Sequence, residues 1–80
     1  MRLDKFLKVS RLIKRRTVAH DASEAGRVLV NGREAKPSYQ VKAGDVLEIA
    51  FGQRSLKVEV TEIKENARKD EAATMYREVP

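Results

Sequence analysis

The chain has 80 residues, a formal net charge of +5 and no cysteine. This length allows one small domain that buries about 60% of its unfolded surface, and the lack of cysteine excludes a disulfide framework and thiolate metal sites. The apolar runs fall far short of the ~20 residues of a membrane helix, and the basic N-terminus lacks the apolar stretch of a signal peptide, so we expect a cytoplasmic protein without a membrane partner.

The positive charge is concentrated in the first sixteen residues, which contain a single acid, Asp4. Basic and acidic side chains nearly cancel in the remainder of the chain. The basic residues of this segment are Arg2, Lys5, Lys8, Arg11, Lys14, Arg15 and Arg16. Charge confined to one end of a chain favours a surface that binds a polyanion.

The first predicted element is a short helix, because Leu3, Phe6 and Leu7 recur at helical spacing. Asp4 is its expected N-cap. Leu12 and Ile13 form a second apolar pair that we expect to be buried. A basic helix with one apolar face can also lie on an anionic membrane, and this alternative remains open from the pattern alone.

A second helix is predicted from Thr17 to the C-terminal glycine Gly26, which can adopt positive φ. Its expected packing side consists of Val18, Ala19, Ala22 and Ala25. The N-terminus of this helix, with Arg15 and Arg16 just ahead of it, favours a phosphate group.

The pattern then changes to strands, at about residues 28–30, 33–35, 46–51 and 56–60. Asn31-Gly32 is a strong two-residue hairpin signal, and a second turn is expected at Gly44-Asp45. We expect residues 46–51 to be largely buried and residues 56–60 to alternate between core and solvent. Residues 64–80 have mixed charge and no clear apolar face. The sequence therefore predicts an α+β domain over 1–63, with two helices packed on a small antiparallel sheet, followed by a charged tail or short helix over 64–80.

Several segments together resemble the RNA-binding domain of the ribosomal small-subunit protein four type. They are RLDKFL, SRL with KRRT, AGRVLVNG and KPSYQVKAGDVL, and they occur in the order and spacing of the family over about residues 1–50. The resemblance implies two packed helices on a small bent sheet, with the helices presenting basic residues to structured RNA. At this length the chain is most similar to the heat-shock-protein-fifteen-like branch and to its members in bacterial ribosome-associated quality control.

That branch implies binding to rRNA of a large ribosomal subunit that still holds P-site peptidyl-tRNA. It also implies a nascent-chain tailing factor on the same subunit, which directs alanine tailing. We expect the protein to act as a monomer without a cofactor. The heat-shock member has a longer, strongly basic C-terminal extension, whereas residues 64–80 are mixed in sign here. We therefore expect the first helices to provide most of the RNA contact.

The candidate RNA-binding residues are the seven basic residues of the first segment together with Lys36 and Ser38, at the end of the first hairpin. Arg2, Arg15 and Arg16 are favoured because guanidinium groups bind phosphate bidentately and stack on bases, and Arg16 is expected to face solvent. For Arg11 the alternative is an ion pair with Asp4 or Asp21.

Other side chains indicate packing or turns rather than chemistry. Tyr39 is expected to pack against Phe51 or Val41, and stacking on a base is the alternative. His20 is expected to be a surface residue without a carboxylate partner. The sequence contains no cluster of metal-ligand residues and no nucleophile with a neighbouring base, so we expect that the protein is not an enzyme. A DNA-binding regulator and an accessory RNA-binding subunit of a separate RNA-modifying enzyme remain the alternatives.

Overall fold

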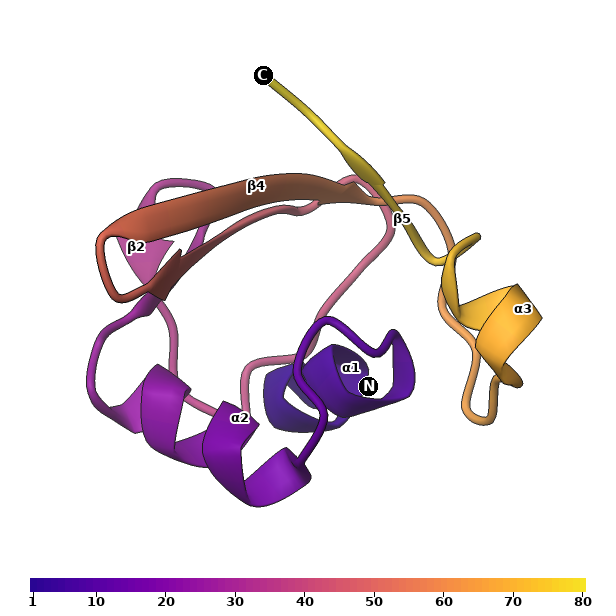
Figure 1. The fold of residues 1–80 in the computed structure, drawn as a ribbon, viewed down its shortest axis with the longest axis horizontal. Helices are drawn as coiled ribbons and strands as arrows, with labels where there is room; N and C mark the ends of the chain where they lie inside the picture. The colour runs from indigo at the N-terminus through magenta and orange to yellow at the C-terminus, as the bar shows by residue number, and fades with distance from the viewer.

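The computed structural model describes residues 1–80, which form a curved five-stranded antiparallel sheet with α1 and α2 packed on one side (Figure 1). The helices are α1 (Leu3–Val9), α2 (Arg16–Glu24) and α3 (Lys69–Ala72). The strands are β1 (Val28–Val30), β2 (Arg33–Glu34), β3 (Val46–Phe51), β4 (Arg54–Val60) and β5 (Tyr76–Glu78), in the spatial order β2-β1-β3-β4-β5. No helix is long and apolar enough to cross a membrane.

Helix α1 places its apolar side chains in the core. Leu3, Phe6 and Leu7 are completely buried, and they join a core that includes Leu47 and Ile49 of β3. These side chains cannot insert into a lipid surface while the fold is intact, which contradicts the alternative of a membrane-bound helix. The expected burial of the helix is confirmed.

The predicted cap of α1 is wrong. Arg2, with extended backbone, precedes the helix, and Asp4 lies inside its first turn with 3% of its surface exposed. The reason is tertiary: the backbone N–H groups of Leu3 and Asp4 donate to the carbonyl oxygens of Tyr39 and Pro37 at 2.8 and 3.2 Å. The start of α1 is therefore satisfied by another loop, and the Asp4 carboxylate is free for other partners.

Helix α2 begins one residue earlier than expected and is rotated relative to the predicted packing side. Ala19 and Ser23 are its buried residues, whereas Val18 is 51% exposed and Ala25 is also exposed. Residues four apart share one helical face, so the 19–23 stripe turns position 18 toward solvent. The Ser23 hydroxyl donates to the carbonyl of Ala19 at 2.9 Å. This hydrogen bond offsets the cost of burying the Ser23 hydroxyl.

The two predicted turns are confirmed, and one buried carboxylate joins them. Asn31 and Gly32 both have positive φ, at 53° and 84°, as the hairpin between β1 and β2 requires. Asp45, 8% exposed, accepts hydrogen bonds from the Asn31 amide, the Tyr39 hydroxyl and the backbone of Lys42 at 3.1, 2.9 and 2.9 Å. Tyr39 also packs against the hydrophobic core, so its ring has the packing role.

The central hairpin pairs β3 with β4 along the whole of β3. Leu47 and Ile49 are buried and β4 alternates as predicted, with Val58 and Val60 in the core. The end of β3 differs from the expectation, because Ala50 and Phe51 are exposed, Phe51 by 43%.

The C-terminal segment forms more structure than a tail. Residues 69–72 form α3, and β5 pairs antiparallel with β4 through residues 76–78. Ala72 and Met75 are buried at 2% and 0% exposure, and Met75 belongs to the main core. The sequence pattern misses β5 because a three-residue edge strand with mainly polar side chains carries almost no periodic signal.

Candidate nucleic-acid interface

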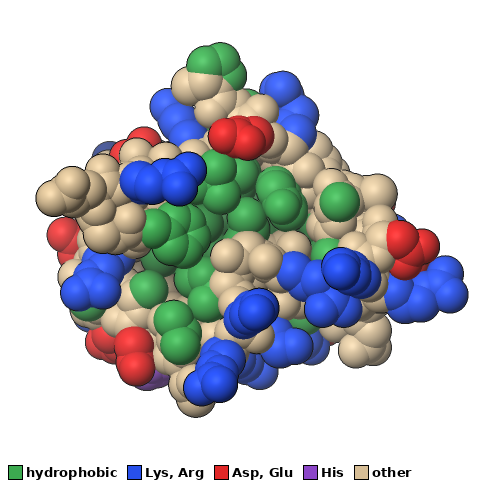
Figure 2. All heavy atoms as spheres, viewed as in Figure 1, with side chains coloured by type: hydrophobic (Ala, Val, Ile, Leu, Met, Phe, Trp, Pro, Cys, Tyr) green, Lys and Arg blue, Asp and Glu red, His purple; other side chains and the backbone are tan.

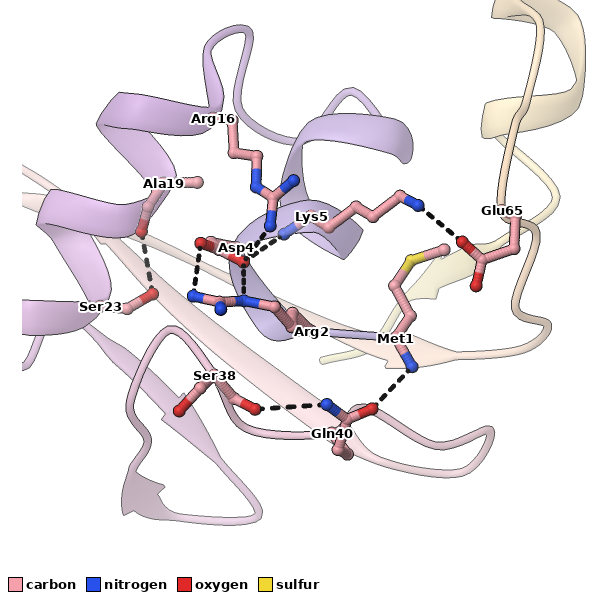
Figure 3. A network of polar contacts seen from close by, with 10 residues as sticks. All are labelled: Met1, Arg2, Asp4, Lys5, Arg16, Ala19, Ser23, Ser38, Gln40 and Glu65. Carbon is pink, nitrogen blue, oxygen red and sulfur yellow. Dashed lines mark hydrogen bonds and ion pairs between the residues drawn. The ribbon is translucent and has the colours of Figure 1, made fainter.

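The N-terminal segment contains a buried carboxylate bonded to two arginines, which we call the Asp4 cluster (Asp4, Arg2 and Arg16; Figure 3). The Asp4 oxygens accept hydrogen bonds from Arg2 Nε and Nη2 at 3.2 and 3.3 Å and from Arg16 Nη2 at 3.4 Å. The backbone N–H of Lys5 donates to the same carboxylate at 2.8 Å. One anion therefore holds two guanidinium groups next to each other, one from the residue that precedes α1 and one from the first residue of α2.

The Asp4 cluster forms at the junction of three parts of the chain. Arg2 lies before α1 and forms an isolated bridge with Gln40, whose side-chain oxygen also accepts from the terminal ammonium of Met1 at 3.1 Å. Arg16 is the first residue of α2, which packs beside α1. Figure 3 shows the guanidinium groups of both arginines converging on Asp4 from opposite sides. Packing of the two helices thus sets the position of both charges.

The pKa of Asp4 lies below its ordinary value of 3.8. Burial acts to raise this pKa, but the hydrogen bonds from Arg2 and Arg16, the charge of Arg16 and the Lys5 backbone N–H outweigh burial. The carboxylate is consequently ionised at neutral pH. An ionised group that is almost fully buried is a firm anchor for the two arginines.

Both arginines remain available to a ligand although Asp4 binds them. Their side chains are 46% and 48% exposed, and the structure contains no other hydrogen bond from either guanidinium. The remaining N–H donors and the faces of the groups can bind phosphate or stack on a base. Arg16 is thus exposed, as expected, and its guanidinium is also ion-paired with Asp4, which the sequence did not predict.

Lys5 contributes less free charge than expected. Its ammonium forms an ion pair with Glu65 at 2.6 Å, and the hydrogen bond and charge of Lys5 lower the pKa of that carboxyl. Glu65 lies in residues 64–80, which the sequence analysis predicts to be a charged tail or short helix outside the domain. The pair connects α1 to the chain just before α3.

Lys8 of α1 lies together with Arg11 and Lys14 from the residues after the helix, and none of the three forms an ion pair. With Lys69 of α3 they line a cleft of about 350 Å³ that has no apolar lining residue. We call these four residues the basic cleft. Figure 2 shows Lys and Arg side chains gathered over α1 and its connection to α2. The alternative pairing of Arg11 with Asp4 or Asp21 does not occur.

The remaining candidates lie at the borders of these two groups. Arg15 precedes α2, is exposed and has no ion-pair partner. Lys36 and Ser38 line a wide hollow of about 670 Å³ beside the first hairpin. Because residues 37–40 bond to the start of α1, Ser38 lies near Arg2 (Figure 3), whereas the basic cleft is formed by the other end of α1.

No constellation of catalytic type accompanies the basic residues. The expectation that His20 has no carboxylate partner is wrong, because its Nδ1 lies 3.6 Å from the carboxylate of Asp21. Both side chains are exposed, and neither is hydrogen-bonded to a nucleophile. No group of three or more His, Cys, Asp or Glu side chains could hold a metal ion. The cleft-lining residue that the sequence analysis did not single out is Lys69, whose only signal was positive charge in a mixed segment.

Comparison with known proteins identifies the family of this fold. The S4 domain model matches residues 1–47, which include every candidate residue of the first segment and of the first hairpin. The chain belongs to the S4 domain family. The resemblance seen in the sequence motifs is thereby confirmed.

Relatives of this S4 domain protein match most of its chain. The RQC P-site tRNA stabilizing factor of Halalkalibacterium halodurans is 60% identical over 76 residues, which cover 95% of this chain and 86% of that protein. The factor of the same name from Bacillus subtilis is 57% identical over 95% of this chain and 88% of its own. The heat shock protein 15 homolog of Aeromonas salmonicida is 37% identical over 85% of this chain, and only 52% of that longer protein is covered.

A solved structure has the same fold as this S4 domain protein. Heat shock protein 15 of Vibrio cholerae, described as trimeric, superimposes with a TM-score of 0.92 at 35% identity. The match covers 99% of this chain and 81% of the Vibrio chain, so it includes α3 and β5. The C-terminal elements are thus part of the shared fold.

Proposed function

We propose that this protein is an RNA-binding factor of ribosome-associated quality control that binds rRNA and P-site tRNA on large ribosomal subunits. In this role it stabilises the peptidyl-tRNA of a stalled subunit and supports alanine tailing of the nascent chain. The relatives at 57–60% identity, named as P-site tRNA stabilizing factors, support the proposal over almost the full chain. Such a factor works in the cytoplasm and needs no catalytic centre.

The Asp4 cluster is the observation that carries the proposal at the level of residues. Arg2 and Arg16 are ordered before a ligand arrives, so little side-chain entropy is lost when they bind. Arginines held at a fixed separation suit phosphates at a fixed separation, as in a folded RNA. The candidate aromatic residue nearby, Tyr39, uses its hydroxyl on Asp45 and its ring in the core, which favours structured RNA over a single-strand stacking platform.

The structure favours RNA over the DNA alternative. The exposed face of α2 carries Thr17, His20, Asp21 and Glu24, two of which are acidic and none of which is Lys or Arg. Acidic side chains on a helix oppose its entry into the major groove of a duplex. The basic side chains lie instead around α1, a helix of seven residues, and the connection that follows it.

The test is binding of the purified protein to bacterial large subunits with and without P-site tRNA, measured by sedimentation. We expect binding to both and tighter binding when tRNA is present. Arg16→Ala should weaken binding roughly 10- to 100-fold, as expected for loss of about 1.5–3 kcal/mol of charged hydrogen bonding. Arg54→Ala is the matched control, because Arg54 is exposed and unpaired on the far hairpin.

Two results would contradict this proposal. Failure of the wild-type protein to sediment with either form of the subunit would contradict ribosome binding. An equal loss of subunit affinity in Arg16→Ala and Arg54→Ala would mean that binding depends on total charge rather than on the Asp4 cluster.

The partners on the subunit are part of the same proposal. We expect a nascent-chain tailing factor to bind the same subunit, and we expect this protein to act as a monomer of 9.1 kDa. Light scattering of the free protein tests the second point. A mass three times larger would match the trimer described for the Vibrio relative and would contradict it.

A further inference from the structure

A second buried carboxylate lies behind the loop that receives the start of α1. Asp45, 8% exposed, lies just before β3, and none of its side-chain hydrogen-bond partners is a candidate RNA-binding residue. We propose that Asp45 is a positioning residue for the Asp4 cluster: through Tyr39 it holds the loop over residues 37–40, and this loop fixes the place of Arg2. The inference rests on the proposed function in that Arg2 binds RNA.

The first link joins Asp45 to the loop. The Tyr39 hydroxyl and the backbone N–H of Lys42 both donate to Asp45 Oδ2, each at 2.9 Å. Tyr39 is also partly buried against the hydrophobic core, so its ring has little freedom once its hydroxyl is bonded. Asp45 thus holds the chain on both sides of residues 40 and 41.

The second link joins the loop to α1. The carbonyl oxygens of Tyr39 and Pro37 accept hydrogen bonds from the backbone N–H groups of Leu3 and Asp4 at 2.8 and 3.2 Å. The first N–H groups of a helix have no partner within the helix, so these two depend on the loop. A displacement of the loop therefore displaces the start of α1 or leaves its N–H groups unpaired.

Arg2 lies directly at this contact. Its backbone forms an isolated bridge with Gln40, and the two residues lie side by side in Figure 3. Its guanidinium bonds to Asp4, which also binds Arg16 of α2. The separation of the two guanidinium groups therefore depends on the packing of α1 against α2 and on the loop that holds Arg2. Asp45 controls the second of these contacts.

The three donors around Asp45 suit a carboxylate and do not suit an amide. Asn31 Nδ2 donates to Asp45 Oδ1 at 3.1 Å, while two other donors face Oδ2. The Asn31 amide is fixed in this orientation, because its oxygen accepts from the N–H of Val46 at 3.0 Å. In either orientation, an asparagine at position 45 would direct its NH₂ group at another N–H donor. The negative charge thus serves to hold two loops at once.

Asp45 and Tyr39 keep the protonation states that this link needs. Burial acts to raise the pKa of Asp45, but the Lys42 backbone N–H, the Asn31 amide and the Tyr39 hydroxyl outweigh burial and place the pKa below 3.8. The hydrogen bond to Asp45, assisted by burial, raises the pKa of the Tyr39 hydroxyl. At neutral pH a protonated hydroxyl therefore donates to an ionised carboxylate, and such a bond is stronger than one between neutral groups.

The first experiment follows the link in the free protein by amide hydrogen exchange, measured by NMR at urea concentrations that do not alter the rates of local opening. Tyr39→Phe keeps the ring and removes only the hydroxyl. Tyr76→Phe is the matched control, because Tyr76 packs against the same core and its hydroxyl forms no hydrogen bond. We expect the amides of Leu3 and Asp4 to exchange about two- to tenfold faster in Tyr39→Phe, as loss of one hydrogen bond predicts, and at the wild-type rate in the control. Wild-type exchange of both amides in Tyr39→Phe would overturn the proposal.

The second experiment is a double-mutant cycle that measures whether the link acts through Arg2. Tyr39→Phe should weaken binding to large subunits about two- to tenfold, the cost of ordering one long side chain on binding. In an Arg2→Ala protein the same substitution should have no further effect, because the side chain that it positions is absent. A purely structural role for the hydroxyl predicts the same loss in both backgrounds. That result, or the absence of a loss in the wild-type background, would refute the positioning role.

Asp45→Asn tests the carboxylate itself in the same cycle. We expect it to weaken subunit binding at least as much as Tyr39→Phe and to have no further effect in the Arg2→Ala protein. Circular dichroism checks that each variant is folded. Tyr39→Phe decides the outcome if Asp45→Asn does not fold.

This proposal and the proposed function fail in different ways. Failure of the wild-type protein to bind subunits contradicts the proposed function, and hydrogen exchange then still decides whether Asp45 positions the start of α1. Normal binding of wild type together with an unaffected Tyr39→Phe contradicts only the positioning role.

Discussion

Replacing Asp4 by asparagine separates orientation of the arginines from simple charge. Asn keeps the size of the side chain and an oxygen that can accept the Lys5 N–H at 2.8 Å, but it removes the anion that Arg2 and Arg16 share. The net charge becomes one unit more positive. A surface that attracts RNA only by charge should then bind more tightly, whereas a surface that depends on ordered arginines should bind more weakly.

The magnitudes decide the expected sign. Two arginines that lose their anchor must be ordered on binding, at about 0.5–1.5 kcal/mol each, which corresponds to roughly 5- to 150-fold in affinity. One added charge about 10 Å from a phosphate in water gains only about 0.4 kcal/mol before salt screening. We therefore expect Asp4→Asn to bind large subunits at least about fivefold more weakly than wild type.

The fold should also lose some stability in Asp4→Asn. Asp4 is 3% exposed, but its partners are half-exposed and water can solvate them once the ion pair is broken. The cost lies between that of a surface pair and that of a buried pair, at about 1–2 kcal/mol, or ~4–8 °C in melting temperature for each kcal/mol in a domain of this size.

The assay is quantitative sedimentation with large subunits, with urea unfolding measured on the same samples. Glu59→Gln is the control, because it adds the same charge and breaks the ion pair with Arg77 on the sheet. Binding of folded Asp4→Asn that equals or exceeds wild type would refute the orienting role. Equal weakening in Glu59→Gln would refute it as well.

Three further predictions concern stability. Asp4 and Asp45 both have a pKa below the ordinary 3.8, so their stabilisation is complete above about pH 4 and is lost as the pH falls through the lower folded values. The melting temperature of the wild type, measured from pH 7 to pH 2, should fall in that acid range. The melting temperature of Asp45→Asn should fall less steeply with pH, and an identical pH dependence in the two proteins would contradict the stabilising role of the Asp45 carboxylate. Arg11→Gly should raise the free energy of unfolding by about 0.5–1 kcal/mol, because relief of the left-handed strain exceeds the extra chain entropy, while RNA binding weakens. Urea unfolding checks this, and destabilisation would contradict it. Met75→Ala should cost about 2–4 kcal/mol in the same assay, because the side chain is fully buried, and a change below about 0.5 kcal/mol would mean that residues 64–80 are detached from the core.

Local signals were sufficient for most of the fold. Asn31-Gly32 predicts its hairpin because only a few residue types adopt two successive positive φ values, and the alternation from residue 56 to 60 predicts one face toward the core. The end of α2 at Gly26 follows from the same preference, with φ at 76°. These features depend on residues that are close together in the chain, so they can be predicted from the sequence. The family motifs added the arrangement of the two helices.

Features that join distant segments were decided only by the folded chain. The sequence contained Asp4 and its basic neighbours, but nothing in their spacing said that α1 would receive its N-terminal hydrogen bonds from residues 37–39 and release Asp4 to bind Arg2 and Arg16. The register of β5 against β4 likewise places α3 so that Lys69 lines the basic cleft.

What the sequence determined by itself was therefore the order of elements, the two main turns and the concentration of positive charge near the N-terminus. What tertiary structure decided was which charges are paired, because an ion pair depends on the separation of side chains in space and on their burial. The sequence contains seven basic residues in one segment. In the folded protein two of them, Arg2 and Arg16, are ion-paired with Asp4, and Lys5 is ion-paired with Glu65, whereas the others form no ion pair.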